Sequence, residues 1–475
     1  MKEIEKHINA YSFSKALALC DEQLFQDDSN VSVMIARGWC LHKIGFGDEA
    51  KDVFDRVVNG DVCTLKEISY DDVMRVYDFF WSVTAYDKLI DVCVAYHHRY
   101  PQEPTVLRRL AAAHSRLAEY RLAAIYYRRA LKADKQVSTE YNLGLTLLQL
   151  GEYEEGLALY EKRHEVNNNI LTKSVFSIPR WSGEPIKGKG IIVWCEQGLG
   201  DVIQFSRYIT LLAEKGARVA LLLTPQYASL AKLLSTLSGA NEVVVISEGR
   251  INLVGAYHYH MPLMSAMHHF SLRPNTIPVQ APYLSAPLDD DSSWGGRLAS
   301  LTGIKVGLVW STLIEKNGDL QTALADHLKD EKSVPLSMLN DLLSLEGVSF
   351  VNLKFPVSLQ ERKELETSGV ADFSNDIAHF ADTASLIDQL DIVISIDTSV
   401  VHLAGAMGKP VINLLPYDSD WRWQQHRDDS PWYPSMRLYR QIYRNQWNEV
   451  IGRVTETLKK AVIHHGKTGC ISINL

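Results

Sequence analysis

The segment that most constrains the fold is VISIDTSVVHLAGAMGKPVINLL, residues 393–415. An apolar run typical of a buried strand stops at Asp397 and is followed by the small polar turn Thr398-Ser399. A helical stretch then begins near Val400 and closes at Gly408-Lys409-Pro410, before a second apolar run. Strand, turn, helix and strand form a βαβ unit, which requires a parallel sheet. The turn would lie at the carboxyl end of the first strand, where open α/β sheets bind ligands.

The start of the helix in this segment favours an anion as the ligand. The first backbone N–H groups of a helix have no intrahelical partner, and the helix dipole is positive at that end. Asp397, Thr398, Ser399, Val400 and Val401 therefore form a candidate phosphate-binding turn. His402 is a candidate donor to a phosphate or a sugar hydroxyl, with an imidazole whose charge changes near neutral pH. A histidine that is hydrogen-bonded between domains is the alternative.

Composition limits the classes of protein that are possible. The chain has 475 residues, so about three domains are expected from the usual domain size. Its net charge of −8 argues against a nucleic-acid partner. No stretch reaches the roughly 18 apolar residues of a membrane-spanning helix, and the N-terminus lacks the apolar region of a secretory signal. The six cysteines have neither zinc nor CxxC spacing. They predict reduced, buried thiols in a cytoplasmic protein.

Residues 1–166 contain a repeat with a period of roughly 34 residues. A small residue or Leu recurs with aromatic residues or Cys on either side, and these central positions are Ala16, Ala50, Leu89, Ala123 and Gly156. The pattern resembles the tetratricopeptide repeat, a helix–turn–helix unit that stacks into an α-helical solenoid. Gly38 and Gly144 mark close approaches between helices, and Gly45 and Gly151 mark turns. The repeats bind a protein or peptide, cover the neighbouring domain or mediate self-association, and the sequence leaves these alternatives open.

The remainder of the chain alternates strands with helices. Two such arrays in tandem predict two Rossmann-like domains that face each other across a cleft, over residues 175–290 and 300–462. Residues 463–475 are expected to be a tail. The extra residues around Asp61–Ser69 and the charged insertion Ser311–Glu331 predict longer loops.

The first array opens with a glycine-rich turn, Glu196-Gln197-Gly198-Leu199-Gly200-Asp201. Gly198 and Gly200 permit a tight turn and a close approach of a ligand to the backbone. Asp201 at the following helix start is a candidate proton acceptor, although a helix N-cap alone would explain an Asp there. Gln204 and Trp310 are further cleft candidates. Lys354, directly after a strand, is a candidate cation for the anion at the Asp397–His402 turn.

Residues 418–441 form an unusual segment in which three tryptophans lie among four arginines. Trp421 and Arg422 are the cleft candidates that it contributes. Aromatic rings and arginines can together bind a base, a sugar or a phosphate. A packed loop that braces the cleft is the alternative.

Several motifs, in order along the chain, carry a family resemblance. EQGLGDVIQFSRY, DTSVVHLAGAMGKPV and DWRWQQHRDDSPWYPSMRLYRQ, with the lesser markers PRWSGEPIKGK, YHYHMPLMS and PYL, resemble bacterial glycosyltransferases of the ADP-heptose:lipopolysaccharide heptosyltransferase family. The resemblance is greater to the branch in which tetratricopeptide repeats precede the transferase. One departure is visible: Lys332-Ser333 stands, after the insertion, where relatives usually carry an Arg-Ser pair.

The resemblance implies a GT-B fold and an inverting sugar transfer from a nucleotide-diphosphate sugar without a metal or other cofactor. It implies that Asp201 is the catalytic carboxylate and that Asp397, Thr398, Ser399, Val400 and His402 hold the donor diphosphate. The expected acceptor is a protein presented by the repeats. A cell-envelope saccharide as acceptor, and an inactive repeat adaptor, remain the alternatives.

Overall fold

The structure is a computed structural model that describes residues 1–60, 68–166, 176–246, 253, 255–279, 281–288, 294–312 and 331–473. The chain divides into two compact units, Met1–Asn167 and Asn168–Leu475. The expected loop residues 61–67 and nearly all of the Ser311–Glu331 insertion lie outside the described residues.

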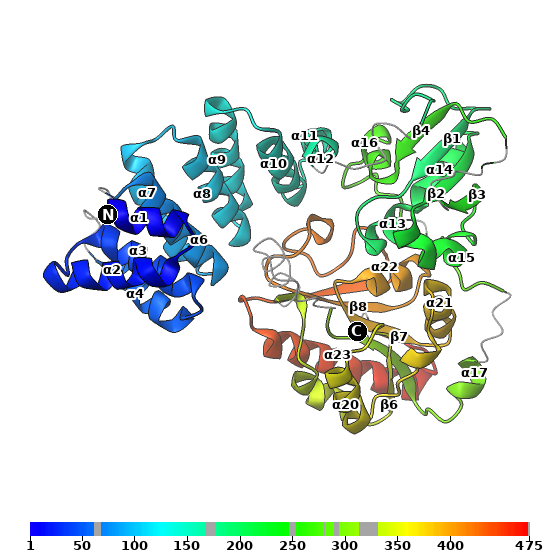
Figure 1. Ribbon diagram of the computed structural model, residues 1–475. Helices are drawn as coiled ribbons and strands as arrows, with labels where there is room; N and C mark the ends of the chain where they lie inside the picture. The colour runs from blue at the N-terminus through cyan, green and yellow to red at the C-terminus, as the bar shows by residue number, and fades with distance from the viewer. Residues whose placement is uncertain are drawn as a thin grey trace. The chain divides into compact units, whose positions relative to one another are not determined.

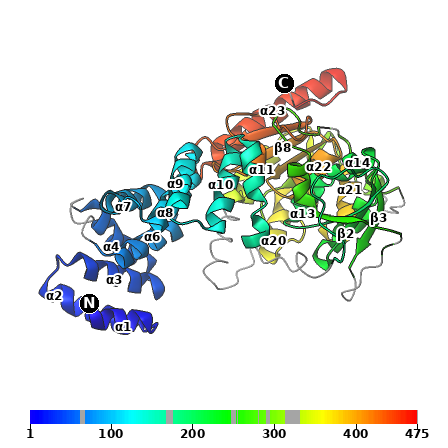
Figure 2. The ribbon, with the colours of Figure 1, turned by 90° about the horizontal axis from the view of Figure 1, so that it is seen from above.

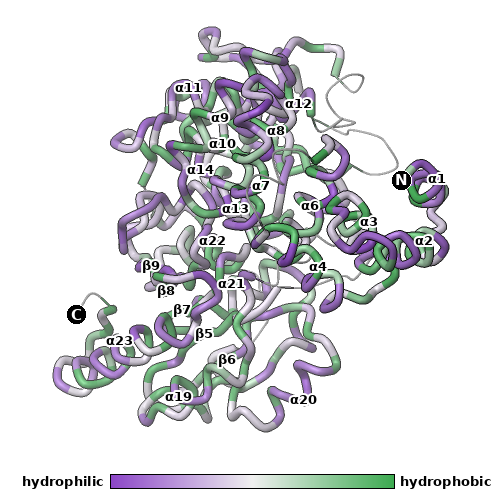
Figure 3. The backbone as a smooth tube through the Cα atoms, turned by 90° about the vertical axis from the view of Figure 1, so that its left-hand side faces the viewer, coloured by the Kyte–Doolittle hydropathy of each residue, from purple (hydrophilic) through white to green (hydrophobic). Residues whose placement is uncertain are grey.

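The first unit consists of helices that stack in chain order (Figures 1 and 2). Their bounds are α1 (Lys2–Asn9), α2 (Phe13–Gln26), α3 (Val31–Lys43), α4 (Gly47–Asn59), α6 (Tyr70–Ser82), α7 (Tyr86–Arg99), α8 (Pro104–Arg116), α9 (Tyr120–Ala133), α10 (Val137–Gln149), α11 (Tyr153–Tyr160) and α12 (Arg163–Val166). Green and purple segments alternate along these helices (Figure 3), as expected when one face of each helix is buried against its neighbours. The predicted helical repeat is confirmed.

Small residues allow the paired helices of each repeat to approach closely. A Cβ atom on Gly144 would lie 2.9 Å from Leu159 Cβ, and one on Gly38 would lie 3.0 Å from the Phe54 ring. Phe54 also stacks on Phe79 of the next repeat, with ring centroids 4.3 Å apart. The turn glycines Gly45 and Gly151 have φ angles of 93° and 78°, which favour glycine. The predicted roles of these glycines are therefore confirmed.

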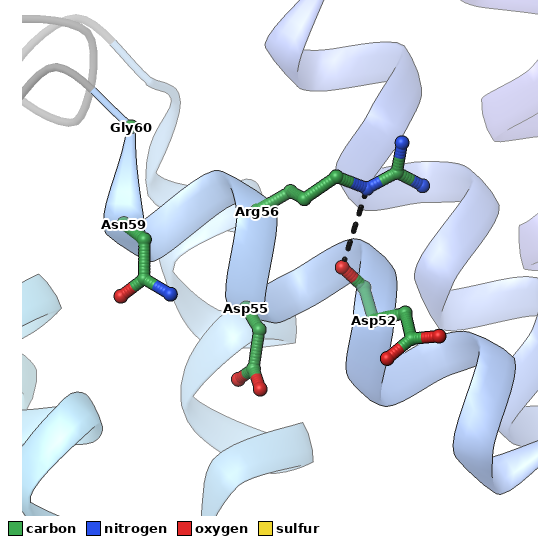
Figure 4. A pocket seen from close by; sticks show the side chains of 5 residues that line it. All are labelled: Asp52, Asp55, Arg56, Asn59 and Gly60. Atoms are coloured by element: carbon green, nitrogen blue, oxygen red, sulfur yellow. Dashed lines mark hydrogen bonds between the residues drawn. The ribbon is translucent and has the colours of Figure 1, made fainter.

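A hollow of about 570 Å³ lies at the end of α4 and is shown in Figure 4. It is lined by Asp52, Asp55, Arg56, Asn59 and Gly60. Lys51 and Lys88 donate to the two carboxylate oxygens of Asp55 over 2.8 and 2.5 Å. The negative charge of Asp55 is thus already compensated by side chains of the repeats.

The second unit begins with a four-stranded parallel sheet in the order β3-β2-β1-β4. The strands are β1 (Gly190–Trp194), β2 (Arg218–Leu223), β3 (Ala240–Val245) and β4 (Tyr259–Pro262). The helical segments among them are α13 (Leu199–Phe205), α14 (Arg207–Glu214), η2 (Pro225–Leu230), α15 (Ala231–Leu234), η3 (Leu263–Ser265) and α16 (Ala266–His269). Strands β1 and β2 are almost wholly buried, as expected for a parallel sheet.

A five-stranded parallel sheet follows, in the order β6-β5-β7-β8-β9. Its strands are β5 (Ile304–Val309), β6 (Val348–Asn352), β7 (Ile392–Ile396), β8 (Val411–Leu415) and β9 (Met436–Arg440). Its helical segments are α17 (Trp294–Arg297), η4 (Leu336–Leu339), α19 (Asn340–Leu343), α20 (Leu359–Ser368), η5 (Ser374–Asp376), α21 (Phe380–Asp388), α22 (Ser399–Ala406), η6 (Trp421–Trp423) and α23 (Trp447–Thr468). The two predicted Rossmann-like arrays are confirmed.

Strand order identifies the ligand-binding edge of each sheet. In the second sheet, β6 lies on one side of β5, and the later strands β7, β8 and β9 lie on its other side. The strand order therefore reverses between β5 and β7. In the first sheet the reversal lies between β1 and β4. Ligands of open α/β sheets bind at the carboxyl ends of strands beside such a reversal. The turns after β1 and β7 occupy these positions, and they carry Asp201 and Asp397.

Two elements differ from the prediction. Strand β9 lies inside the segment 418–441, where no strand was expected, and it pairs with the buried strand β8. Helix α23 continues to Thr468, past the expected domain end at residue 462. Its buried positions recur to Ala461, and its last turns carry on past that packed face to the glycine cap Gly469, φ 70°.

Candidate functional site

The glycine-rich turn and the anion-binding turn meet in the structure. Helices α13 and α22 lie side by side (Figure 1). A Cβ atom on Gly200 would lie 2.9 Å from His402 Cδ2 and 3.4 Å from Ser399 Cα. Glycine is therefore the residue that allows the two helix starts to approach this closely. The structure brings together two turns that are about 200 residues apart in sequence.

Asp201 is the third residue of α13, rather than its N-cap. Its Oδ2 accepts a hydrogen bond from the backbone N–H of Gly198 over 2.7 Å, and its Oδ1 accepts one from Arg422 Nη2. About 20% of the side chain remains exposed. Burial raises the pKa of the Asp201 carboxyl, although Arg422 and the Gly198 N–H oppose this rise. The raised pKa makes Asp201 a stronger base than an ordinary aspartate.

Arg422 reaches Asp201 from the other sheet. It lies on the turn η6 that follows β8, where the carboxylate of Asp420 accepts from both its backbone N–H and its Nη1, over 3.0 and 2.7 Å. The guanidinium lies 5.3 Å from the Phe205 ring and 5.1 Å from the Trp421 ring. Arg422 thus places a buried positive charge between the two halves of the unit.

The start of α22 has the features of an anion site. Thr398 is its N-cap residue, with Oγ1 3.1 Å from Ser395 Oγ. No described residue accepts a hydrogen bond from the backbone N–H of Ser399 or Val400, whereas Val401 N–H donates to Thr398 O over 3.2 Å. Lys332 Nζ donates to Asp397 Oδ2 over 3.2 Å, and Asp397 raises the pKa of Lys332. A lysine therefore stands beside two available N–H groups.

His402 is a neutral, immobilised imidazole. Its Nδ1 lies 3.1 Å from Tyr433 Oη, and its ring stacks on Trp423 with centroids 5.3 Å apart. Burial, together with the positive charge of Arg422, lowers its pKa well below the ordinary value. The lowered pKa differs from the expected change of charge near neutral pH, because burial disfavours the imidazolium.

The other sequence candidates have separate positions. Lys354 Nζ donates to both oxygens of Glu361 over 2.6 and 2.5 Å, and no described contact joins its amine to the Asp397–His402 turn. Trp310 and Glu196 are buried directly after β5 and β1. Gln197 has φ 68°, and its carbonyl accepts from Tyr227 Oη over 2.8 Å. Gln204 is fully buried, and its amide has no hydrogen-bond partner among the described residues.

The aromatic segment 418–441 is mainly a packed loop. Trp421, Trp423, Trp432 and Tyr433 are all buried. Arg440 donates to Ser419 Oγ and to the carbonyl oxygens of Trp423 and Gln424, which fixes the η6 turn. Arg427 and Arg437 face the acidic side chains of Asp429 and Asp428. Within the segment, Arg422 is therefore the arginine that the structure brings to Asp201.

Sequence reasoning assigned no role to three charged residues that shape the site. Lys332 contacts Asp397 and Asp420 contacts Arg422, both of which were predicted site residues, and Arg207 connects the two halves of the second unit. Arg207 donates to the carbonyl oxygens of Pro278 and Trp432 over 2.5 and 3.0 Å and to Tyr283 Oη over 3.1 Å. Its position six residues after Asp201, inside a helical apolar pattern, was the available signal.

Two kinds of feature are absent from the described residues. Among them, no group of three or more His, Cys, Asp or Glu side chains is arranged to hold a metal ion. None of their helices combines the length and apolarity that crossing a bilayer requires. Cys20, Cys40, Cys93 and Cys195 are buried free thiols, Cys470 is exposed, and Cys63 lies outside the described residues.

Comparison with known proteins confirms the family resemblance at the C-terminal end. Residues 378–457 match the model of glycosyltransferase family 9 (heptosyltransferase). Protein FlbA of Caulobacter vibrioides is 28% identical over 332 residues, which cover 66% of this chain and 53% of FlbA. The chain thus spans about half the length of this curated relative. The matched family segment contains α21, β7, α22, β8 and β9, and so includes the Asp397–His402 turn and Arg422.

Solved structures of MamA resemble the helical repeats only in outline. MamA from Desulfovibrio magneticus is 15% identical, and the match covers 35% of this chain and 92% of MamA with a TM-score of 0.30. A second MamA structure is 16% identical, covering 38% of this chain and 96% of MamA with a TM-score of 0.31.

Proposed function

We propose that residues 168–475 form a GT-B glycosyltransferase that moves a sugar from a nucleotide-diphosphate sugar to an acceptor hydroxyl, with inversion and without a metal. One observation carries the proposal. A carboxylate of raised pKa and a helix start with available N–H groups and a lysine meet at the ligand-binding edges of two parallel sheets. The family 9 match over residues 378–457 supports glycosyl transfer as the chemistry.

The proposed reaction is a single displacement. Asp201 takes the proton of the acceptor hydroxyl as its oxygen forms a bond to the anomeric carbon. The bond between that carbon and the diphosphate oxygen breaks on the opposite face, and the diphosphate leaves with the bonding electron pair. Configuration at the anomeric carbon is therefore inverted.

The charge that develops on the leaving diphosphate needs stabilisation. The backbone N–H groups of Ser399 and Val400, the positive end of α22 and the ammonium of Lys332 are positioned to supply it. A preorganised donor of this kind can stabilise a transition state by about 3 kcal/mol in a water-poor site. The sequence has Lys332-Ser333 where relatives usually carry an Arg-Ser pair, and Lys332 would supply the positive charge of the missing arginine. His402, being neutral, would contribute a hydrogen bond rather than a charge.

The repeats are proposed to present a protein acceptor, and the buried free thiols suit a cytoplasmic location. Each helical repeat adds surface that can bind an extended partner, which a small saccharide acceptor would not need. A cell-envelope saccharide remains the second candidate, because the matched family model is that of heptosyltransferases.

Replacing Asp201 by Asn tests the base directly. The amide keeps the size of the side chain but cannot take the proton, so sugar transfer should fall by about 10²- to 10⁴-fold. A donor screen by thermal shift comes first, since a nucleotide that binds the native protein raises its melting temperature. Donor turnover by Asp201→Asn is then compared with that of Asp429→Asn, which removes an exposed carboxylate of the 418–441 segment.

Three outcomes distinguish Asp201 as the base from the alternative hypotheses. Loss of transfer only in Asp201→Asn supports the proposed base. Equal transfer by both variants would remove Asp201 from the mechanism. Absence of turnover by the wild-type protein with every nucleotide sugar would favour an inactive adaptor.

A further inference from the structure

Arg422 is shared between an acidic side chain of each sheet. Its Nη2 contacts Asp201, which follows β1, and its Nη1 lies 2.7 Å from Asp420, which precedes η6. The backbone of Arg422 is fixed at both ends, by Asp420 at its N–H and by Trp432 Nε1, which donates to its carbonyl over 2.9 Å. The backbone of Arg422 is therefore held in place, and a movement of this residue would be a rotation of its guanidinium.

The charges around Asp201 are unequal in number. Asp397 and Asp420 are the carboxylates that face it, from the end of β7 and from η6, while Arg422 is its cation and Lys332 faces Asp397. His402 on α22 is neutral, and the phenol of Tyr227 on η2 is also within electrostatic range. Three carboxylates thus lie near Arg422 and Lys332, and Arg207 is a further cation within electrostatic range of His402. A diphosphate that enters at α22 would add more negative charge, and Arg422 is a cation at this site that can change partner.

We propose that Arg422 is a positioning residue that changes partners during the reaction. In the ligand-free protein it holds the Asp201 carboxylate, and on donor binding its guanidinium turns to the diphosphate and leaves Asp201 as the base. The proposal rests on the proposed function, because it assigns an order of events to the same site.

The geometry makes this exchange a short movement. A Cβ atom on Gly200 would contact Ser399 and His402, so the helix start that carries Asp201 lies against the start of α22. In the ligand-free protein Asp420 and the rings of Phe205 and Trp421 contact the guanidinium, and these contacts would hold it near α22 as it turns. Phosphate oxygens are good bidentate acceptors for a guanidinium.

The exchange has a functional consequence. A carboxylate paired with a guanidinium is a weaker base than the same carboxylate alone, because the positive charge favours its ionised form. Asp201 would therefore be a stronger base when a donor is present than when the donor site is empty. This order protects the protein from deprotonating an acceptor, or water, at an empty donor site.

The test compares Arg422→Gln with the wild-type protein in the full chain. Arg427→Gln is the matched control, since it removes a half-buried arginine of the same segment that pairs with Asp429. Calorimetry with ADP, GDP and UDP, each in two buffers of different ionisation enthalpy, measures both affinity and proton uptake. The acid limb of the pH profile of kcat reports the pKa of the base in the donor-bound protein. The acid limb of kcat/KM for the donor reports the pKa of the base in the donor-free protein.

We expect two results for the wild-type protein and its control, Arg427→Gln. A nucleoside diphosphate binds with proton uptake, and the acid limb of kcat lies at higher pH than that of kcat/KM. In Arg422→Gln the diphosphate binds at least about tenfold more weakly, as expected when a hydrogen bond to a charged group is lost. Its two acid limbs coincide, and both lie at the higher pH.

Other results would contradict the proposal in distinguishable ways. Unchanged diphosphate affinity and separate acid limbs in Arg422→Gln would show that the Arg422–Asp201 contact is only structural, while leaving the transferase function in place. A wild-type protein that binds none of the three diphosphates and transfers no sugar would overturn both. Arg422→Lys keeps the positive charge but cannot donate two parallel hydrogen bonds to a phosphate. If Arg422→Gln fails to fold, Arg422→Lys is used instead, and weaker diphosphate binding with coinciding acid limbs would support the proposal.

Discussion

His402 shows how burial can reverse a prediction made from residue type. Histidine is the usual side chain for a charge change near neutral pH, yet here Trp423, Tyr433 and Gly200 enclose the ring. The same enclosure makes the ring a fixed hydrogen-bonding group. Its identity was predictable from the βαβ pattern, but its protonation state depends on residues 423 and 433, which no local pattern connects to it.

The buried neutral state of His402 predicts a pH dependence of stability. The pKa of His402 is lowered in the folded protein, so between the folded and unfolded values the unfolded chain binds more protons. Stability is therefore complete above the unfolded value, about 6.5, and falls by about 1.4 kcal/mol per pH unit below it. Denaturant unfolding at pH 7.5 and 5.5 should show a smaller loss for His402→Gln than for wild type. An equal loss in both would mean that other groups cause it.

At the scale of elements, the contact between α13 and α22 decides whether a site exists. Each turn alone is a common feature of α/β sheets, and the sequence predicted each of them correctly. Their juxtaposition follows from the absence of a side chain at Gly200, which lets His402 and Ser399 fill that space. Strand β9 was missed because its five residues, Met436–Arg440, follow a proline-rich, aromatic stretch that masks the strand pattern.

Adding one methyl group at this contact should therefore separate the two turns. We expect Gly200→Ala to lower sugar transfer by roughly 10- to 100-fold, since small misplacements of reacting groups have effects of that size. Gly452→Ala in α23 is the control, because a Cβ there meets no atom within 4 Å. Diphosphate affinity and kcat are the measurements. Transfer at the wild-type rate in Gly200→Ala would show that the close approach is not required.

At the scale of the whole molecule, the helical repeats and the proposed chemistry belong to separate units of the chain. The proposed reacting and donor-binding groups, from Asp201 to Arg422, all belong to the second unit, whereas the repeats form a unit of their own. Period and alternation predicted both architectures, since each depends on local patterns. Residues that join distant segments, such as Lys332 on Asp397, could not be predicted, because nothing in the sequence specifies which side chains meet across a sheet edge.

Deleting residues 1–166 should leave donor binding and remove acceptor use. The shortened protein is expected to bind its nucleoside diphosphate within about threefold of the full chain, while transfer to a protein acceptor falls below detection. Circular dichroism and thermal unfolding check that the remainder folds. Undiminished transfer to the acceptor after deletion would exclude the presentation role of the repeats.

The arginine that joins the two sheets also bears on how this protein can be engineered. Arg207 donates to the carbonyl oxygens of Gln204, Pro278 and Trp432 and to Tyr283 Oη, and its charge faces the rings of Tyr283, Trp432 and Tyr433. The first half of the second unit, expressed alone, would lose the Trp432 carbonyl and two of these rings, and the second half would lack the cation that the rings face. Replacing one half with that of a relative to alter donor specificity would therefore need to keep both Arg207 and its partners Trp432 and Tyr433.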